Sequence, residues 1–256
     1  MKKIAFTLVL NGLPFIKKQA SIIPNVFDVW YIIEGATLPV KDTAWCKNID
    51  NEYYNDKKIS IDGTSEFLDS IASDKIKIIR KNDFWDGKVE MCNSFMNEVE
   101  NSILMEFDVD EIWKEETLKE ILTFTEQNNN FDGMFFKCNY FVGPNLLTEG
   151  ENCYGNNSYE WNRLWVIKDK TEWISHEPPR IKGLTSFVPK SWTSERNWKF
   201  DHYAYVFESQ VKFKENFYGY TGAVEQWKKL QSQTNFPIQL NQFFPWVDIL
   251  VNVIKL

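Results

Sequence analysis

The order of apolar and polar positions in the first half of the chain predicts strands that alternate with helices. Ile4–Leu10, Val29–Ile33 and Lys75–Arg80 are apolar or alternating runs typical of strands, and Gly87–Val99 has apolar residues at helical spacing. A further buried strand is predicted over Ile103–Phe107. This order favours an α/β fold with a mostly parallel central sheet, flanked by helices and joined by right-handed crossovers.

The second half predicts a smaller mixed sheet followed by helices. Phe131–Phe141, Trp161–Ile167 and His202–Phe207 are strand-like, and a helical segment follows over residues 208–231. A polar loop at residues 143–159 separates the first two of these strands and suits a lid or a wall of a site. Because no linker-like composition divides the 256 residues, we expect one domain. The apolar C-terminal tail is expected to pack on this domain or on a partner.

The composition limits the partners of this protein. Its net charge of -7 argues against a nucleic acid or an anionic membrane as the main partner. The four cysteines are scattered and form no C-x-x-C pair, which favours reduced thiols and a cytoplasmic location. The apolar stretch near the N-terminus is short for a signal peptide, and no run approaches the ~20 apolar residues of a membrane span. Aromatic residues make up 16% of the chain, which is compatible with a carbohydrate ligand.

Carboxylates gather at the end of the predicted Ile103–Phe107 strand, at Glu106, Asp108, Asp110 and Glu111. Alternate side chains of an extended chain point the same way, so Asp108 and Asp110 can converge on one cation. Carboxylates are preferred ligands of Mg²⁺ and Mn²⁺, and substrate phosphates often complete the coordination of such ions. We expect Asp110 to bind the metal directly and Asp108 to reach a ribose, or the metal through water. Alternatively, Asp110 caps a helix that begins at Glu111.

Polar residues also follow the first two strands, at Asn11 and Glu34. Ligands of parallel α/β sheets bind outside the carboxyl ends of the strands, so these residues and the acidic cluster predict one site. His176 and His202 are candidates for further metal ligands, with a hydrogen-bonded core position as the alternative for each. Lys88, in the first turn of a predicted helix, opposes the helix dipole and suggests an anionic ligand, with a solvated lysine as the alternative.

Four charged residues are embedded in aromatic, strand-like sequence of the second half: Glu160, Arg163, Glu177 and Arg180. Glu177 or Glu160 is a candidate for the general base that takes a proton from an acceptor hydroxyl. One of the arginines would neutralise a leaving phosphate. The alternative for at least one pair of these residues is a structural ion pair.

Together these segments resemble the GT-A glycosyltransferases, in particular the family-2-like enzymes. The resemblance is carried by IAFTLVLNGLPFI, WYIIEGA, DGKVEMCN and ILMEFDVDEIW, and more loosely by WISHEPPRI and HYAYVFESQVKFKENFYGY. It implies a single GT-A, Rossmann-like domain, with a nucleotide-sugar-binding half at residues 1–115 and an acceptor-side half with C-terminal helices at 116–256. It further implies a hexosyltransferase of glycan biosynthesis that uses Mn²⁺ or Mg²⁺. Such an enzyme transfers a sugar from a UDP-sugar, with inversion, to a hydroxyl of a glycan or another acceptor.

The resemblance also assigns roles to individual residues. Asp108 and Asp110 resemble the family's D-x-D pair, and His176 resembles the late histidine that completes the metal shell. This chain has Glu34-Gly35-Ala36 where many members have Asp-Asp-Gly-Ser, and it lacks a clear Glu-Asp pair for the base. The resemblance therefore does not choose between the two candidate bases. The residues that it places around the nucleotide are Leu10, Asn11, Glu34, Lys88 and Asn93.

Two other functions fit parts of the pattern. A sugar nucleotidyltransferase shares the α/β layout and the acidic metal site. It needs a Gly-rich loop with Arg or Lys after the first strand to hold a triphosphate, and residues 11–14 (NGLP) are no such loop. A non-catalytic carbohydrate-binding protein on the same fold would bind sugars without turnover, because a fold alone does not determine function.

Overall fold

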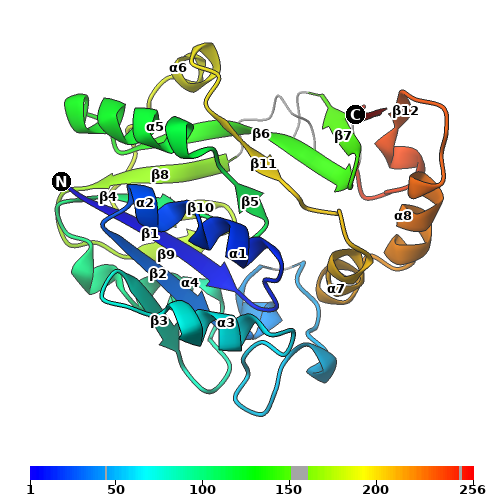
Figure 1. Cartoon of the computed structure of the whole chain (residues 1–256), viewed down its shortest axis with the longest axis horizontal. Coiled ribbons are helices and arrows are strands. Elements are labelled where there is room, and N and C mark those ends of the chain that lie inside the picture. The colour runs from blue at the N-terminus through cyan, green and yellow to red at the C-terminus, as the bar shows by residue number, and fades with distance from the viewer. Residues whose placement is uncertain (44, 151–160, 248–249) are drawn as a thin grey trace.

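The computed structural model describes residues 1–43, 45–150, 161–247 and 250–256 (Figure 1). Its first half alternates strands and helices, as the apolar pattern predicts. The elements of this half are β1 (Lys2–Val9), α1 (Phe15–Ala20), α2 (Ile23–Val26), β2 (Val29–Glu34), α3 (Thr64–Ile71), β3 (Ile76–Arg80), α4 (Lys88–Asn93) and β4 (Ser102–Glu106).

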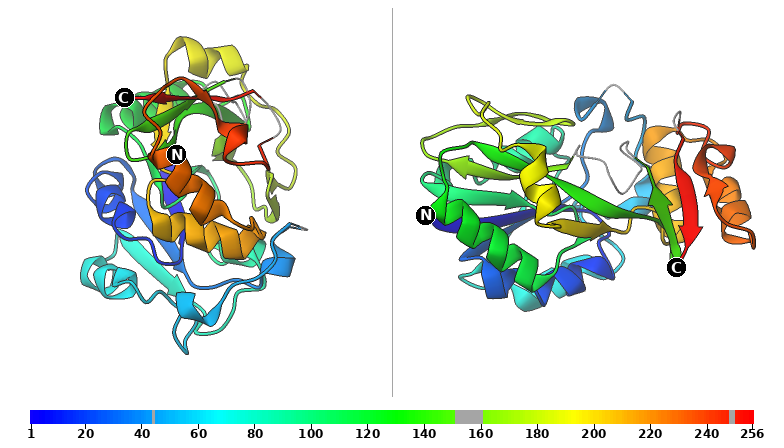
Figure 2. Two further views of the ribbon diagram at one scale, coloured as in Figure 1. Left: turned by 90° about the vertical axis from the view of Figure 1, so that its right-hand side faces the viewer. Right: turned by 90° about the horizontal axis from the view of Figure 1, so that it is seen from above.

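The second half adds short strands and the longer helices. These elements are β5 (Glu111–Ile112), α5 (Glu115–Gln127), β6 (Gly133–Gly143), β7 (Leu146–Glu149), β8 (Trp161–Ile167), β9 (Trp173–His176), β10 (Pro179–Ile181), α6 (Lys190–Glu195), β11 (Lys199–His202), α7 (Glu208–Tyr218), α8 (Ala223–Gln231), β12 (Ile238–Gln239) and β13 (Asn252–Lys255). Figure 2 shows α7 and α8 at one end of the molecule, beside β7 and β13.

One large sheet runs through both halves, in the order β12-β13-β7-β6-β8-β4-β1-β2-β3. The strands β3, β2, β1 and β4 are parallel to their neighbours in this order, and β8 pairs antiparallel with β4. From β8 to β12 the pairs along this path are antiparallel, while β11 joins β6 in parallel and carries β5. The strands β9 and β10 form a separate two-stranded sheet. The predicted α/β fold with its central sheet is confirmed. The smaller mixed sheet expected in the second half is not separate, because its strands extend the central sheet through the β4–β8 pair.

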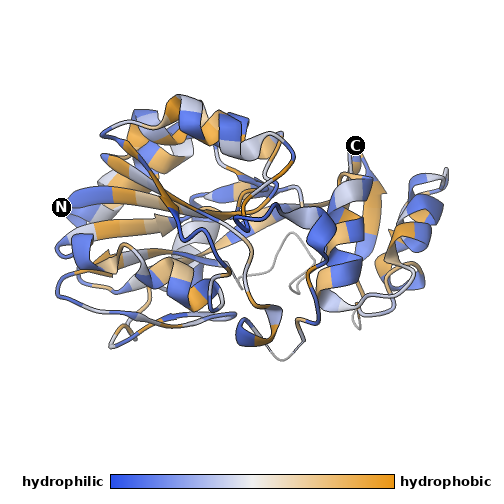
Figure 3. Ribbon diagram, turned by 90° about the horizontal axis from the view of Figure 1, so that it is seen from below, coloured by the Kyte–Doolittle hydropathy of each residue, from blue (hydrophilic) through white to orange (hydrophobic). Residues whose placement is uncertain are grey.

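Alternation along β1 separates two layers of the core. Ala5 and Val9 belong to a cluster that includes buried residues of α1, α3 and α5 on one face of the sheet. Ile4 and Phe6 belong to a second cluster, with buried residues of α4 and β9 on the other face. Figure 3 shows the strands as largely hydrophobic and the helices as half hydrophobic, half hydrophilic. Helices thus cover both faces of the parallel part of the sheet.

Several local predictions were wrong in their bounds or type. The helix predicted over residues 87–99 ends at Asn93, and a 3₁₀ turn follows at Met96–Glu98. The helix expected to begin at Glu111 begins at Glu115 instead. The residues Glu111–Ile112 form the strand β5, which pairs with β11. The strand predicted over His202–Phe207 lies earlier and ends at His202.

The C-terminal tail packs on the protein itself. Its strand β13 pairs with β7 and β12, and Val251 and Val253 are fully buried in the main core cluster. Among the described residues, no helix has both the length and the apolar character needed to cross a membrane.

Candidate functional site

The acidic cluster lies at the carboxyl end of the parallel strands, between β4 and β5. Glu106 ends β4 opposite Phe6 of β1 and is fully buried. After it, the side chains of Asp108 and Asp110 are 33% and 14% exposed. The backbone turns back on itself here, with the N–H of Glu111 donating to the carbonyl oxygen of Asp108 at 2.9 Å. The two aspartates are therefore the carboxylates of this turn that a ligand can reach.

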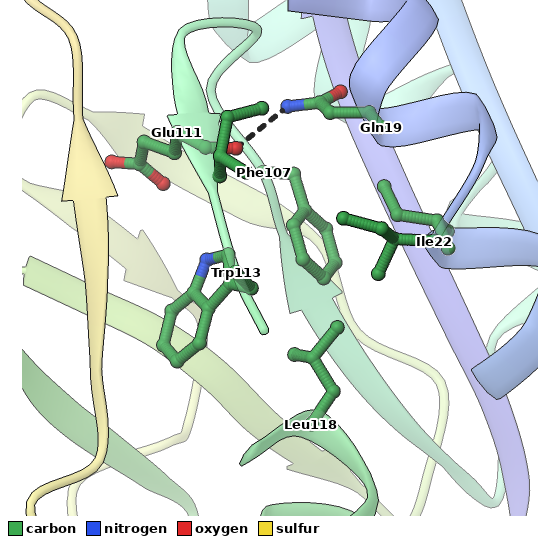
Figure 4. Close-up of a pocket in the computed structure, with 8 residues that line it drawn as sticks. Gln19, Ile22, Phe107, Glu111, Trp113 and Leu118 are labelled. Atoms are coloured by element: carbon green, nitrogen blue, oxygen red, sulfur yellow. Dashed lines mark hydrogen bonds between the residues drawn. The ribbon is translucent and has the colours of Figure 1, made fainter. Parts of the chain in front are cut away.

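Gln19 of α1 fixes the backbone of this turn. Its side-chain amide donates to the carbonyl oxygens of Asp108, Val109 and Glu111, at 2.7, 3.2 and 3.1 Å. Figure 4 shows the last of these bonds, with the Glu111 carboxylate directed away from Gln19. A buried glutamine on α1 thus holds the turn at residues 106–111, here called the acidic turn, against the sheet. No pattern in the sequence pointed to Gln19.

Arg163 is the central cation of the site. It lies on β8 beside β4, is 3% exposed, and contacts three carboxylates. Its Nη2 lies 2.5 Å from Oδ2 of Asp108, and its Nε donates to the Glu111 carboxylate at 3.0 and 3.1 Å. Its Nη1 lies 3.5 Å from Oε2 of Glu106. Arg163 therefore forms its ion pairs with the acidic turn, whereas Glu177, one of its expected partners, pairs with Lys88.

These ion pairs shift the pKa values of both partners. Burial alone would lower the pKa of Arg163, but Asp108, Glu111 and Glu106 outweigh it and raise that pKa well above its usual value. Burial would raise the pKa of Asp108, but Arg163, with help from His176 and Lys88, lowers it to about 2. Asp108 is therefore fully ionised at neutral pH.

His176 ends β9 and lies against the base of the acidic turn. Its Nε2 lies 2.7 Å from Oε1 of Glu106, and Glu106, Asp108 and His176 each offer a ligand atom within 4.8 Å of the others. Among the described residues, Oε2 of Glu106 and Nδ1 of His176 are buried without a hydrogen-bond partner. The sequence left Glu106 ambiguous, although alternation already placed it on the Asp108 face of the strand.

Asp110 and His202 form a second carboxylate–imidazole pair. The Nε2 atom of His202 lies 3.5 Å from Oδ1 of Asp110, because β11 pairs with β5 and places His202 opposite Glu111. Gln210 of α7 approaches the other oxygen, Oδ2, at 3.5 Å. Burial would raise the pKa of Asp110, but His202 outweighs it and the pKa is lowered. The two histidines thus lie at separate carboxylates of the turn.

Lys88 and Glu177 form an ion pair at the edge of the site. Lys88 is the first residue of α4, and its ammonium group contacts Oε1 of Glu177. Burial would raise the pKa of Glu177, but Lys88 and His176 lower it. Oε1 of Glu177 also lies 3.9 Å from Nδ1 of His176. Glu177 is thus an ionised carboxylate beside the acidic turn. Because Lys88 pairs with it, the alternative of a solvated lysine is wrong.

Glu34 is fully buried at the end of β2, and protein groups occupy both of its carboxylate oxygens. Ser65 and the backbone N–H of Ser60 donate to Oε1, at 2.5 and 3.2 Å. Arg80 donates from Nε to Oε2 at 2.6 Å. These bonds join β2 to β3 and α3, so the contacts of Glu34 in the structure are internal.

The remaining residues predicted to line the nucleotide pocket also make internal contacts. The Asn11 side chain donates to the carbonyl oxygen of Tyr53 and accepts from the N–H of Ile61. Asn93 bonds both backbone groups of Trp173, at 3.0 and 2.8 Å, and so ties α4 to β9. Leu10 packs, together with several aromatic rings, against a small buried cluster of Ala36, Cys46, Ile49 and Phe217. Glu160 lies outside the described residues.

Comparisons with known proteins gave only distant structural matches. No protein-family model matches this sequence, and no curated protein matches it either. A crystal structure of S. aureus TarS, residues 1–349, matches with 13% identity and a TM-score of 0.38 over 59% of this chain. The same TarS fragment in complex with UDP-GlcNAc matches with 14% identity and a TM-score of 0.37 over 56% of this chain. The chain spans 38% and 35% of these two structures.

Proposed function

We propose that this protein is a GT-A-type glycosyltransferase that transfers a sugar from a UDP-sugar to a hydroxyl of a glycan or another acceptor. The observation that carries the proposal is the acidic turn at residues 106–111, which lies at the carboxyl end of a parallel sheet with two histidines beside it. This is the edge where α/β sheets bind their ligands. The sequence resemblance to family-2-like enzymes supports the same reading.

The donor atoms at this edge suit Mn²⁺ or Mg²⁺, which prefer carboxylates and accept imidazole. We assign the ion to Asp110 and His202, whose facing atoms lie 3.5 Å apart, because no arginine or lysine of the described residues forms an ion pair with Asp110. Asp108 lies beside them and faces the ribose, or the ion through water. The set of Glu106, Asp108 and His176 is less suitable, since Arg163 already neutralises its carboxylates. His176 then serves to orient Glu106 and Glu177.

When bound, such an ion would offset the negative charge on the diphosphate leaving group. The chain's own residues supply the rest of the chemistry. Glu177, which is ionised at neutral pH, accepts the proton of the acceptor hydroxyl as that hydroxyl attacks the anomeric carbon. Lys88 holds this carboxylate in place. Arg163 is saturated by three carboxylates, so its role is to hold Asp108 rather than to bind phosphate.

A panel of nucleotide sugars tests the proposal. The wild type is incubated with UDP-, GDP- and ADP-sugars, with glycan acceptors, and with Mn²⁺, Mg²⁺ or EDTA. We expect release of UDP that requires the metal and that Asp110→Ala abolishes. Asp56→Ala, which removes an exposed carboxylate on a loop, serves as the matched control and should keep full activity.

Each other outcome of this panel counts against a specific part of the proposal. Turnover that EDTA leaves unchanged, or a folded and active Asp110→Ala variant, would contradict the metal assignment. Sugar binding without turnover would favour the carbohydrate-binding alternative. Formation of a nucleotide sugar from a sugar 1-phosphate and UTP would favour the nucleotidyltransferase.

A further inference from the structure

The helix α7 lies against the acidic turn. Figure 1 shows it beside the carboxyl end of β1, where the turn also lies. Gln210 anchors this approach, because its side-chain amide donates to the carbonyl oxygen of Tyr203 at 2.8 Å and lies 3.5 Å from Asp110. Residues four apart share a helix face, so Lys214 lies one turn further along the same face. The side of α7 that meets the site therefore carries a lysine.

Lys214 is half-buried, and it forms no ion pair with any residue that the structure describes. Its ammonium group lies 4.6 Å from the centre of the Tyr205 ring. Burial lowers the pKa of Lys214, and the neighbouring carboxylates of Asp110 and Asp108 offset this only in part. The Lys214 ammonium group thus interacts electrostatically with Asp110 and Asp108, although no ion pair in the described residues joins it to either carboxylate.

Three other cations at or near the turn already have carboxylate partners. Arg163 contacts Asp108 and Glu111, and Lys88 contacts Glu177. On the same helix, two residues before Lys214, Lys212 forms an ion pair with Glu52 at 3.0 Å. Unlike these three cations, Lys214 keeps capacity for a ligand anion.

We propose that Lys214 binds the diphosphate group of the donor. The inference rests on the proposed function, since that function places a diphosphate at this turn. A compact ammonium group offers three donors in no fixed plane, which suits phosphate oxygens. Its partial burial strengthens the interaction, because fewer waters screen it. A diphosphate bound by Lys214 would also be attracted by a metal ion held at Asp110, so the two cations would stabilise it together.

Calorimetric titration of the 256-residue chain in the presence of Mn²⁺ tests this role. The probes are UDP, inorganic diphosphate and uridine, and the variants are Lys214→Met, Lys214→Arg and the matched control Lys212→Met. We expect Lys214→Met to weaken binding of UDP and inorganic diphosphate by about ten- to hundredfold, the range of a charge-assisted hydrogen bond. Uridine affinity should stay unchanged, Lys214→Arg should retain part of the UDP affinity, and Lys212→Met should match the wild type.

The alternatives are separated by the same titrations. Equal UDP binding by wild type and Lys214→Met would overturn the inference and leave the proposed function standing. An equal loss for uridine and UDP would overturn it too, because it would indicate a structural role. Lys214-dependent binding of inorganic diphosphate, without transfer from any nucleotide sugar, would support the anion site and refute the glycosyltransferase. A wild type that binds none of the probes would overturn both.

Discussion

The Nη2 atom of Arg163 lies 2.5 Å from Oδ2 of Asp108, and this contact joins the antiparallel part of the sheet to the turn that carries the site. Arg163 belongs to β8, whereas Asp108 follows β4, and the two strands are neighbours. The contact explains why a chain can place several carboxylates within a few residues at a buried strand end. A buried cation from a distant segment offsets their repulsion.

Replacing this cation should destabilise the fold strongly. We expect Arg163→Met to lower the free energy of unfolding by about 3–5 kcal/mol, because three carboxylates, two of them fully buried, lose their counter-charge. Urea denaturation followed by circular dichroism measures this change. Arg196→Met, which removes an exposed arginine that lies over the rings of Phe124, Trp192 and Trp198, is the control and should cost only about 1 kcal/mol. A loss of the same size in both variants would contradict the role of Arg163.

Acid should destabilise the protein through Asp108. The pKa of Asp108 is about 2 in the folded protein and 3.8 for an unperturbed group, so the ionised form is favoured by folding. The corresponding stability is present above pH 3.8 and is lost as the pH falls toward 2. Asp110 and Glu177, whose pKa values are also lowered, act in the same direction.

Thermal unfolding between pH 2 and pH 6 measures this dependence. We expect the melting temperature of the wild type to fall steeply below about pH 4, the range in which the aspartates protonate. Asp108→Asn should be less stable at neutral pH and should show a shallower fall. A variant with the same acid slope as the wild type would show that Asp108 does not contribute.

Removing the Glu34 carboxylate should lower the stability of the fold, with no direct effect on ligand binding. Its oxygens are held by Ser65, Ser60 and Arg80, so Glu34→Ala leaves several donors unpaired and should cost about 3 kcal/mol. Chemical denaturation measures the loss, with Glu66→Ala on the exposed side of α3 as the control. A fully stable Glu34→Ala protein with reduced UDP affinity would instead support a direct nucleotide contact.

The general base can be tested with Glu177→Gln. We expect kcat to fall by about 10²–10⁴-fold, because the amide cannot accept the proton, while UDP affinity is retained. Since Lys88 lowers the pKa of this carboxylate, the base stays ionised well below neutral pH, and the rate should fall only in acid. Glu172→Gln, at an exposed position four residues before β9 ends, is the control. Full activity of the Glu177→Gln variant would exclude this residue as the base.

The local pattern of apolar residues was sufficient to predict the strands of the parallel half of the fold. The apolar runs around Ile4, Val29 and Ile103 lie in strands of the sheet, because continuous apolar segments have few alternatives to a buried strand. The predicted bounds of elements were wrong where pairing with a distant strand overrode the local helix propensity. Glu111 has acidic, helix-start character in the sequence, yet it enters β5 because β11 supplies a partner strand and Arg163 a counter-charge.

The sequence by itself determined the α/β class and placed Asp108 and Asp110 at the carboxyl end of a buried strand, since both depend on residues close together in the chain. Only the tertiary structure decided the partners of these carboxylates. Arg163, His202 and Gln210 lie far from the acidic turn in the chain, and they reach it through strand order and the packing of α7. Contacts of this kind depend on how whole elements are arranged in space, which residue spacing along one chain does not record.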